Sequence, residues 1–299
     1  MKGGCLMTGR PRRRSVLCVP GGDEYKIRKA LTAGADQVVI DLEDAVPPAD
    51  KDRARALLGA IAWSEIADEL PAITVRVNAP RTPWCHSDIN AVVRLGVPAS
   101  SIVLPKVESV GDLEFADRLL DGVEAGAGHA QRIAVEALIE TADGLSRIEQ
   151  IASATSRLST LITGYADLAA SLGRTAGLEP ALWIAVQDRV IAAARTNRLD
   201  VVDGPHLGVG VDDAFGAAVG HAARIGFDAK WAIHPRQIET INLAFEPSSE
   251  QVRYARAVVD ALAAAHEGGR GAVELDGQMI DEAIAVAARR TLLKSGVSL

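Results

Sequence analysis

The chain has 299 residues, of which 48% are hydrophobic and 24% are charged. This is the composition of an ordinary globular protein, which excludes a disordered or fibrous chain. With 32 Lys and Arg against 39 Asp and Glu, the net charge is −7, so we expect no nucleic-acid partner. One basic cluster lies near the N-terminus and is interpreted as a solvated tail before the first strand; it comprises Arg10, Arg12, Arg13 and Arg14.

Cysteine content and hydropathy indicate where the protein works. Cys5, Cys18 and Cys85 form no CxxC pair and no cluster with histidine, so a disulfide framework and a structural zinc site are not expected. No apolar run approaches the roughly 18 residues of a membrane-spanning helix. The sequence therefore predicts a soluble, cytoplasmic protein with no membrane partner.

Short runs rich in β-branched residues recur along the chain, as expected for parallel strands that are buried on both faces. Successive runs are separated by 22, 35, 29, 31, 28, 40 and 30 residues, close to the roughly 30 residues that a βα unit needs. The predicted strands are residues 15–20, 37–42, 72–78, 101–107, 132–139, 158–163, 199–203 and 229–234.

Helical signals fill the segments between these runs. Asp23 can cap a helix that ends before Gly34, and Pro180 can open a long helix that reaches Asn197. Eight alternations of strand and helix predict an α/β fold, a (β/α)8 TIM barrel. An open doubly wound sheet is the alternative, but the turn after the first strand lacks its GxGxxG pattern.

The barrel is expected to occupy residues 1–245, and residues 246–299 to form a C-terminal helical lid. This extension reads as a helix over 249–266, a glycine-rich break that can act as a hinge, and a second helix ending near Lys294. Because 54 residues are few for a separate hydrophobic core, we expect the lid to have no core of its own. It should pack on the barrel or on a neighbouring subunit.

Acidic side chains gather at the carboxyl ends of the predicted strands, where TIM barrels carry their active sites. Like charges at short range raise each other's pKa, and a divalent cation removes that cost. Oxygen donors without Cys or clustered His favour Mg²⁺ over zinc. One arginine, Arg76, stands among these acids, which are Asp41, Glu43, Asp44, Glu108, Glu136, Glu140, Asp167 and Asp203.

Glu140 and Asp167 are the candidate metal pair, because they follow adjacent strands and Mg²⁺ usually takes only one or two protein carboxylates. Each has a simpler interpretation when taken alone. Glu140 could favour the N-terminus of the next helix, and Asp167 could be a helix cap. The residues by themselves leave both interpretations open.

Short motifs continue along nearly the whole chain, from residue 14 to residue 281. Their order and spacing resemble the HpcH/HpaI aldolase family, in the citrate lyase β-subunit-like branch that includes malyl-CoA and citramalyl-CoA lyases. The motifs are RSVLCVPG at 14–21, DLEDAV at 41–46, RVN at 76–78, LPKVE at 104–108, IET at 139–141, DL at 167–168, IHP at 233–235 and DGQMID at 276–281.

The resemblance implies roles for the residues around the strand ends. It makes Glu140 and Asp167 the Mg²⁺ ligands, with Glu140 also among the substrate-binding residues. Arg76 would bind the keto-acid carboxylate and the thioester oxygen and act in catalysis. Glu43 and Asp44 would hold metal-bound water in a second shell.

Other implied roles belong to flanking segments. Asp281 resembles the catalytic acid/base of the lid, which this family delivers to a neighbouring subunit, so a homo-oligomer, a trimer by resemblance, is expected. The loop from Pro20 to Lys26 resembles the region that receives coenzyme A phosphates, and His234 is placed with these substrate-binding residues. The run 204–208 after the seventh strand lacks the Asp common there, which leaves the acyl group open.

The implied activity is reversible, Mg²⁺-dependent cleavage of a β-hydroxyacyl-CoA thioester, of citramalyl-CoA or malyl-CoA type, into acetyl-CoA and a 2-keto acid. One alternative is a citrate lyase β-subunit that acts on a carrier-bound citryl thioester within a complex, and another is a malyl-CoA thioesterase. A Schiff-base aldolase that uses Lys106 and a non-catalytic CoA-binding module are further alternatives.

Overall fold

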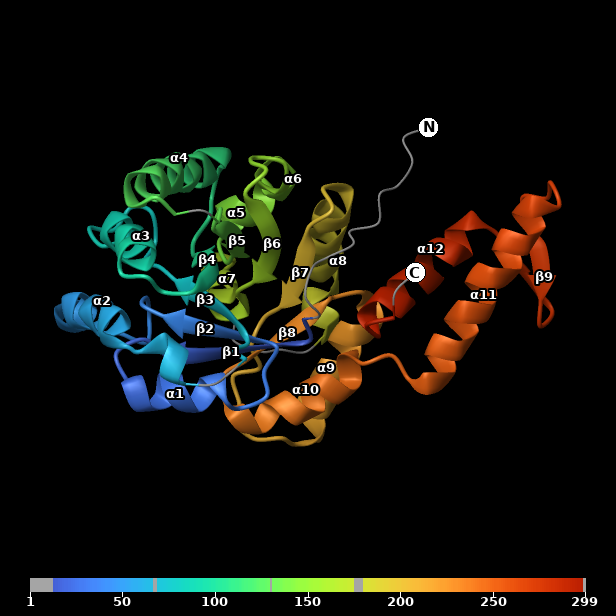
Figure 1. The fold of residues 1–299 in the computed structure, drawn as a ribbon, viewed down its shortest axis with the longest axis horizontal. Helices are drawn as coiled ribbons and strands as arrows, with labels where there is room; N and C mark the ends of the chain where they lie inside the picture. The colour runs from blue at the N-terminus through green and yellow to red at the C-terminus, as the bar shows by residue number, and fades with distance from the viewer. Residues whose placement is uncertain (1–12, 67–68, 130, 175–179, 298–299) are drawn as a thin grey trace. The chain divides into compact units, whose positions relative to one another are not determined.

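The computed structural model describes residues 13–66, 69–129, 131–174 and 180–297. By its internal contacts the chain divides into two compact units: residues 13–242, and the segment that begins at residue 243. Each unit is described by itself below and can be followed along the colour bar of Figure 1. Cys5, Arg10 and Arg12 of the sequence analysis lie outside the described residues.

Residues 13–242 form a closed barrel of eight strands in sequence order. All neighbouring strands are parallel, and β1 pairs with both β2 and β8, which closes the sheet on itself. The predicted (β/α)8 barrel is thereby confirmed. The strands are β1 (Ser15–Pro20), β2 (Gln37–Asp41), β3 (Ala72–Arg76), β4 (Ala99–Leu104), β5 (Ala134–Ile139), β6 (Leu158–Thr163), β7 (Asp200–Asp203) and β8 (Ala229–Ala232).

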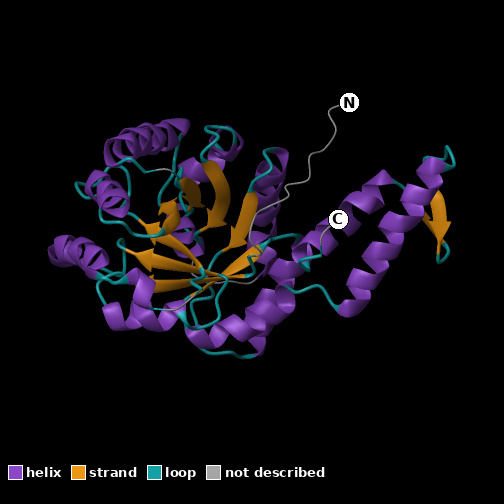
Figure 2. Ribbon diagram, in the orientation of Figure 1, coloured by secondary structure: helices purple, strands orange, loops and turns teal. Residues whose placement is uncertain are grey.

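Helices surround the strands, purple around orange in Figure 2. Asp23 caps α1 as predicted, because its side chain accepts a hydrogen bond from the Lys26 amide. Among the described residues, every helix is too short or too polar to span a lipid bilayer. The α-helices are α1 (Glu24–Leu31), α2 (Lys51–Ala60), α3 (Cys85–Arg94), α4 (Val110–Ala127), α5 (Ala142–Ser146), α6 (Ile148–Ala152), α7 (Tyr165–Ser171), α8 (Pro180–Thr196), α9 (Asp213–Ile225) and α10 (Ile238–Phe245). Short 3-10 turns are η1 (Pro48–Asp50), η2 (Trp63–Glu65) and η3 (Pro235–Gln237).

The centre of the barrel is filled by an apolar layer. Its buried side chains come from all eight strands except β3, and nearly all are aliphatic. Side chains of this kind fill a barrel interior as a packed core rather than a channel. The layer consists of Val16, Val39, Val103, Leu138, Ile162, Val202, Ala229 and Trp231, with Cys18 and Ile233 packed against it.

A polar network closes the amino end of the barrel. Arg13 donates to Gln37 (2.9 Å) and Glu136 (3.2 Å) through Nη1, and to Thr160 (2.8 Å) and Asp200 (3.1 Å) through Nη2. The prediction that Arg13 belongs to a solvated tail is therefore wrong. The prediction that Glu136 lies among the acids of the carboxyl end is also wrong, because these partners hold it near the amino ends of the strands.

The C-terminal unit has a small core of its own, contrary to expectation. Helices α11 (Ser249–Glu267) and α12 (Glu282–Lys294) pack together, and a hairpin of β9 (Val273–Leu275) and β10 (Gln278–Ile280) connects them. Small side chains let the two helices pack closely, so a core can form from few residues. The buried cluster is Ala255, Val258, Leu262, Ile280, Ala285, Ala288 and Leu292.

The predicted glycine-rich break follows α11, with Gly268 at its C-cap, and the hairpin comes after it; the role of the break as a hinge stays a prediction. Asp276 and Gly277 form the turn of the hairpin with φ values of 51° and 78°. Positive φ at both central residues is the type I′ geometry for which Asp-Gly is the typical sequence. The packing of this unit on the barrel or on a neighbouring subunit stays a prediction.

Removing the Arg13 side chain should destabilise the barrel, because Glu136 would keep its buried charge without a cationic partner. For Arg13→Ala we expect a loss of about 3–5 kcal/mol in the free energy of unfolding, measured by chemical denaturation. The control is Arg53→Ala, which removes an exposed ion pair with Asp50 and should cost less than about 1 kcal/mol. Equal losses in the two variants would contradict this assignment.

Candidate active site

Strand register brings Asp41 and Arg76 side by side at the ends of β2 and β3. The Arg76 guanidinium donates to both carboxylate oxygens of Asp41, from Nε at 2.8 Å and from Nη2 at 2.6 Å. The same carboxylate accepts hydrogen bonds from the backbone amides of Glu43 and Ala45. Asp41 therefore fixes the orientation of Arg76, a role that the sequence did not assign to it.

Glu43 lies between two cations. Its Oε1 accepts from Lys106 Nζ at 2.7 Å, and its Oε2 lies 3.0 Å from Arg76 Nη1. Burial alone would lower the pKa of Lys106, but the hydrogen bond to Glu43 and the charge of Glu140 raise it above its usual value. A raised pKa keeps the amine protonated, which argues against the Schiff-base alternative because that reaction needs a neutral amine.

Glu140 follows β5 and is almost completely buried, at 2% exposure. Its Oε1 accepts a hydrogen bond from the Lys106 backbone amide at 2.9 Å, where Lys106 has the unusual φ of 51°. Gly164 makes room for the side chain, since a Cβ on that glycine would lie 2.6 Å from Glu140 Cβ and 2.7 Å from its Oε2. Burial, with added repulsion from Glu43 and Asp167, raises the pKa of Glu140 to about 8.

Asp167 lies in the first turn of α7 and lines the same pocket as Glu140. The structure does not support the interpretation of Asp167 as a helix cap, because the N-cap position of α7 is Gly164. Glu140 directly precedes Thr141, whose side chain caps α5 by accepting from the Gly144 amide, so the interpretation that Glu140 favours this helix N-terminus stays open. Both residues line the pocket.

The pocket at the carboxyl ends of the strands has a volume of about 430 Å³. Its lining combines charged side chains with apolar and aromatic ones, which suits a small organic acid. The charged residues are Asp41, Asp44, Arg76, Glu140 and Asp167. The other lining residues are Cys18, Pro20, Ala45, Leu138, Ile162, Gly164, Tyr165, Ala166, Pro205, Trp231 and Ile233.

The donor set fits a hard divalent cation. Glu140 and Asp167 offer carboxylate oxygens, and the raised pKa of Glu140 reflects first its burial and then repulsion from Glu43 and Asp167, costs that a bound cation would offset. Nowhere in the described part of the chain do three or more His, Cys, Asp or Glu side chains gather as a metal cluster. A pair of carboxylates is nevertheless enough for Mg²⁺, which completes its coordination with water and substrate oxygens.

The remaining predicted residues lie in different settings. Pro20 and the exposed Asp44 line the pocket, whereas Lys26 and His234 are not among its described lining residues. Lys26 pairs with Asp23 at 3.4 Å on the exposed face of α1, and His234 Nδ1 accepts from the Arg236 amide to cap η3. Asp281 caps α12 in the C-terminal unit. The substrate and acid/base roles of these residues stay predictions.

Sequence reasoning did not assign the apolar and aromatic part of the pocket lining, of which three residues stand out. Tyr165 and Trp231 supply its aromatic surface, and Cys18 lies beside them. Burial raises the pKa of the Cys18 thiol to about 12, so it contributes as a neutral group. Trp231 and Cys18 sit in predicted strands, where alternation could have placed them inside the barrel, but no local pattern identifies Tyr165.

Comparisons with known proteins show the family of the chain. Residues 14–235 match the model of the HpcH/HpaI aldolase/citrate lyase family. The chain belongs to that family. This confirms the resemblance predicted from the motifs, and the match spans every strand of the barrel.

Characterised relatives cover nearly the full chain. An L-malyl-CoA/β-methylmalyl-CoA lyase of Cereibacter sphaeroides is 32% identical over 90% of each chain, and a (3S)-malyl-CoA thioesterase of that species is 35% identical over 94% of each. A solved structure of the protein CitE from Mycobacterium tuberculosis, in complex with magnesium, acetoacetate and coenzyme A, is 29% identical with a TM-score of 0.74. The alignment covers 95% of this chain and 98% of that one.

Gly164→Ala should displace Glu140, because the added methyl group would occupy the space of its Cβ and carboxylate. We expect the affinity for Mg²⁺, measured by calorimetry, to fall at least about ten-fold. Gly122→Ala is the matched control, since a Cβ there meets nothing within 4 Å. Unchanged Mg²⁺ affinity in Gly164→Ala would show that the site does not depend on this close approach.

Glu140 should make the metal-free protein less stable as pH rises. Its carboxyl has a pKa of about 8 when folded against an ordinary 4.5, so the folded protein holds a proton that the unfolded chain releases. Stability is therefore lost between about pH 4.5 and pH 8, by a few kcal/mol. Glu140→Gln should remove this loss in denaturation curves recorded in EDTA, whereas the exposed control Glu114→Gln should keep it. Parallel pH profiles for wild type and Glu140→Gln would contradict the assignment.

Proposed function

We propose that the protein is a Mg²⁺-dependent carbon–carbon lyase. It cleaves a β-hydroxyacyl-CoA thioester of malyl-CoA or citramalyl-CoA type, reversibly, into acetyl-CoA and a 2-keto acid. The observation that carries the proposal is one pocket, in a member of this family, that combines the buried Glu140, the neighbouring Asp167 and the anchored Arg76.

Glu140 and Asp167 would hold the metal ion through their carboxylates. When bound there, Mg²⁺ supplies Lewis-acid chemistry: it favours ionisation of a coordinated hydroxyl and orients an α-oxygenated acid. Glu43 and Asp44 would hold water bound to the metal ion, as the family resemblance implies. Glu43 keeps Lys106 and Arg76 in place, while the exposed carboxylate of Asp44 lies 3.4 Å from Arg76 Nη1.

Arg76 would stabilise negative charge as the carbon–carbon bond breaks. Its guanidinium is planar and permanently charged, and Asp41 holds it in one orientation. A donor that is already oriented gains more from charge that develops in the transition state than a mobile side chain does. Arg76 would thus bind the substrate carboxylate and the thioester oxygen.

The finer assignments belong to the same proposal. Asp281 would exchange the proton at the carbon of acetyl-CoA, as the family resemblance implies, and a homo-oligomer would bring this residue to a site. Pro20, Lys26 and His234 would contact the CoA portion or the substrate. The proposal also includes a cytoplasmic location.

A thioesterase is the second candidate function, favoured by the 35% identity to a (3S)-malyl-CoA thioesterase. The same pocket could orient water toward the thioester carbonyl instead of breaking the carbon–carbon bond. Products separate the two: a lyase releases acetyl-CoA and a 2-keto acid, whereas a thioesterase releases free CoA and the intact hydroxy acid.

Purified protein with Mg²⁺ should convert malyl-CoA or citramalyl-CoA into acetyl-CoA. Chromatography of the CoA products measures this conversion. EDTA should abolish the reaction and excess Mg²⁺ restore it. Asp167→Asn should lower kcat/KM by about 100-fold or more, because one of the two metal ligands is weakened. Glu114→Gln on the exposed surface of α4 is the control.

Three results would contradict the lyase assignment. Activity that survives EDTA would exclude the metal role. Free CoA without acetyl-CoA would favour the thioesterase. Cleavage that appears only with a carrier-bound thioester and added partner subunits would favour a citrate lyase β-subunit.

A further inference from the structure

Tyr165 separates the active-site pocket from a second, much smaller cavity. Its side chain lines the pocket of about 430 Å³ and also a cavity of about 30 Å³. The small cavity is large enough for about one water molecule. Besides Tyr165, only Pro205 appears in both described linings, so these two residues lie between the two spaces.

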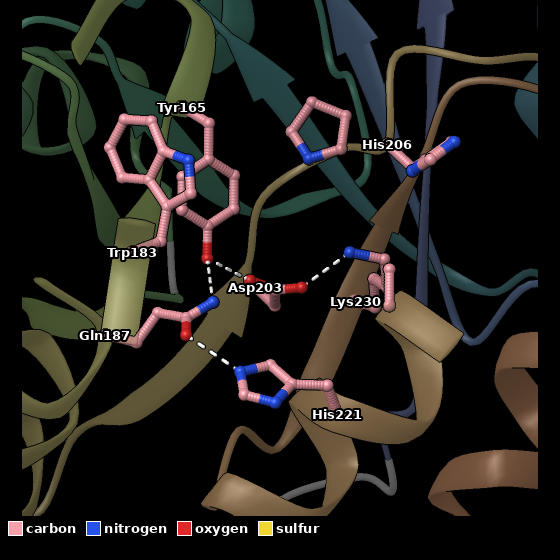
Figure 3. A pocket seen from close by; sticks show the side chains of 9 residues that line it. Tyr165, Trp183, Gln187, Asp203, His206, His221 and Lys230 are labelled. Carbon is pink, nitrogen blue, oxygen red and sulfur yellow. Dashed lines mark hydrogen bonds and ion pairs between the residues drawn. The ribbon is translucent and has the colours of Figure 1, made fainter. Parts of the chain in front are cut away.

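The hydroxyl of Tyr165 is held by a buried network, drawn in Figure 3. It donates to Asp203 Oδ1 and accepts from Gln187 Nε2 at 2.8 Å. The other oxygen of Asp203 accepts from Lys230 Nζ at 2.5 Å, and His221 Nε2 lies 3.0 Å from Gln187 Oε1. Because these partners come from α8, β7, β8 and α9, the hydroxyl is fixed from several directions.

The ring of Tyr165 is confined as well. Trp183 packs against it edge-on, with ring centroids 4.9 Å apart. On another side, Gly204 lets the backbone approach, since a Cβ there would lie 2.9 Å from Tyr165 Cδ2 and 2.1 Å from the Thr163 carbonyl oxygen. The ring therefore has little freedom to move aside for a ligand in the pocket.

Tyr165 also lies next to the candidate metal pair. It is the first residue of α7, and Asp167 lies in the same turn. Gly164, which directly precedes Tyr165, is the residue that packs closely against the Glu140 side chain. An acid bound at Glu140 and Asp167 thus has the rigid ring as a neighbour, and the apolar side chains of Ile162 and Leu138 continue the same wall.

We propose that Tyr165 is a specificity-determining residue that limits the size of the alkyl group on the 2-keto acid. This inference rests on the proposed lyase function. A rigid wall rejects a group that is one or two methylenes too large, because the ring is confined between Trp183 and the backbone at Gly204 and cannot move aside. Truncating Tyr165 would join the two cavities and admit longer acids.

The test measures dissociation constants by calorimetry, with Mg²⁺ present, for glyoxylate, pyruvate, 2-oxobutanoate and 2-oxopentanoate. In the wild type we expect affinity to drop about ten-fold or more at one step of this series. Tyr165→Ala should move the drop to a longer acid, and Tyr165→Leu, which fills part of the space, should give an intermediate shift. Thermal melting checks that each variant is folded.

Two control variants distinguish the effect of the Tyr165 ring from that of the hydrogen bonds around its hydroxyl. Tyr165→Phe keeps the ring and should keep the wild-type position of the drop. His221→Ala enlarges only the small cavity and should do the same. An unchanged series in folded Tyr165→Ala and Tyr165→Leu, or an equal shift in Tyr165→Phe, would overturn the role of Tyr165. A wild type that binds none of the four acids would instead contradict the proposed function, and the inference with it.

Discussion

The buried carboxylate of Glu140 is the constraint on which the arrangement of the site depends. A carboxylate with 2% exposure loses the solvation that water would give it, and the nearby acids increase the cost of its charge. The chain compensates only in part, through one backbone amide and the Lys106 ammonium 3.8 Å away. The metal-free protein therefore holds a proton on Glu140 up to about pH 8, and a divalent ion would take the place of that proton.

The charged side chains at the two ends of the barrel differ in how completely they are paired. At the amino end, Glu136 and Arg13 are enclosed in a network in which polar partners surround the guanidinium. At the carboxyl end, the lining of the open pocket holds four acids, Asp41, Asp44, Glu140 and Asp167, against the single cation Arg76. Paired charges at one end favour the fold, whereas unbalanced charges at the other leave binding capacity for a ligand.

Much of the barrel follows from local pattern. Strands buried on both faces need continuous apolar runs, so all eight could be located, and parallel topology then brought Glu140 and Asp167 to one edge. Arg13 could not be placed in this way, because its partners lie between 24 and 187 residues further along the chain. An arginine before a strand has the same local sequence whether it is solvated or closes a barrel.

Side-chain partnerships were harder to predict than positions. The Asp41–Arg76 pair depends on strand register, which spacing alone does not specify. Tyr165 acquires its place through contacts with Gln187 of α8 and Asp203 of β7, which lie 22 and 38 residues further along the chain. The hairpin turn at Asp276 and Gly277 did carry a local signal, but strands of three residues offer little alternation to accompany it.

The attachment of Arg76 to Asp41 has an entropic consequence. A long, flexible side chain loses up to about 2 kcal/mol of rotamer freedom when it is ordered, and here folding has already imposed that loss. An incoming anion therefore meets a guanidinium that needs no further ordering, and association is correspondingly more favourable. Asp41, together with Glu43 at Nη1, thus keeps the guanidinium in position before a ligand binds.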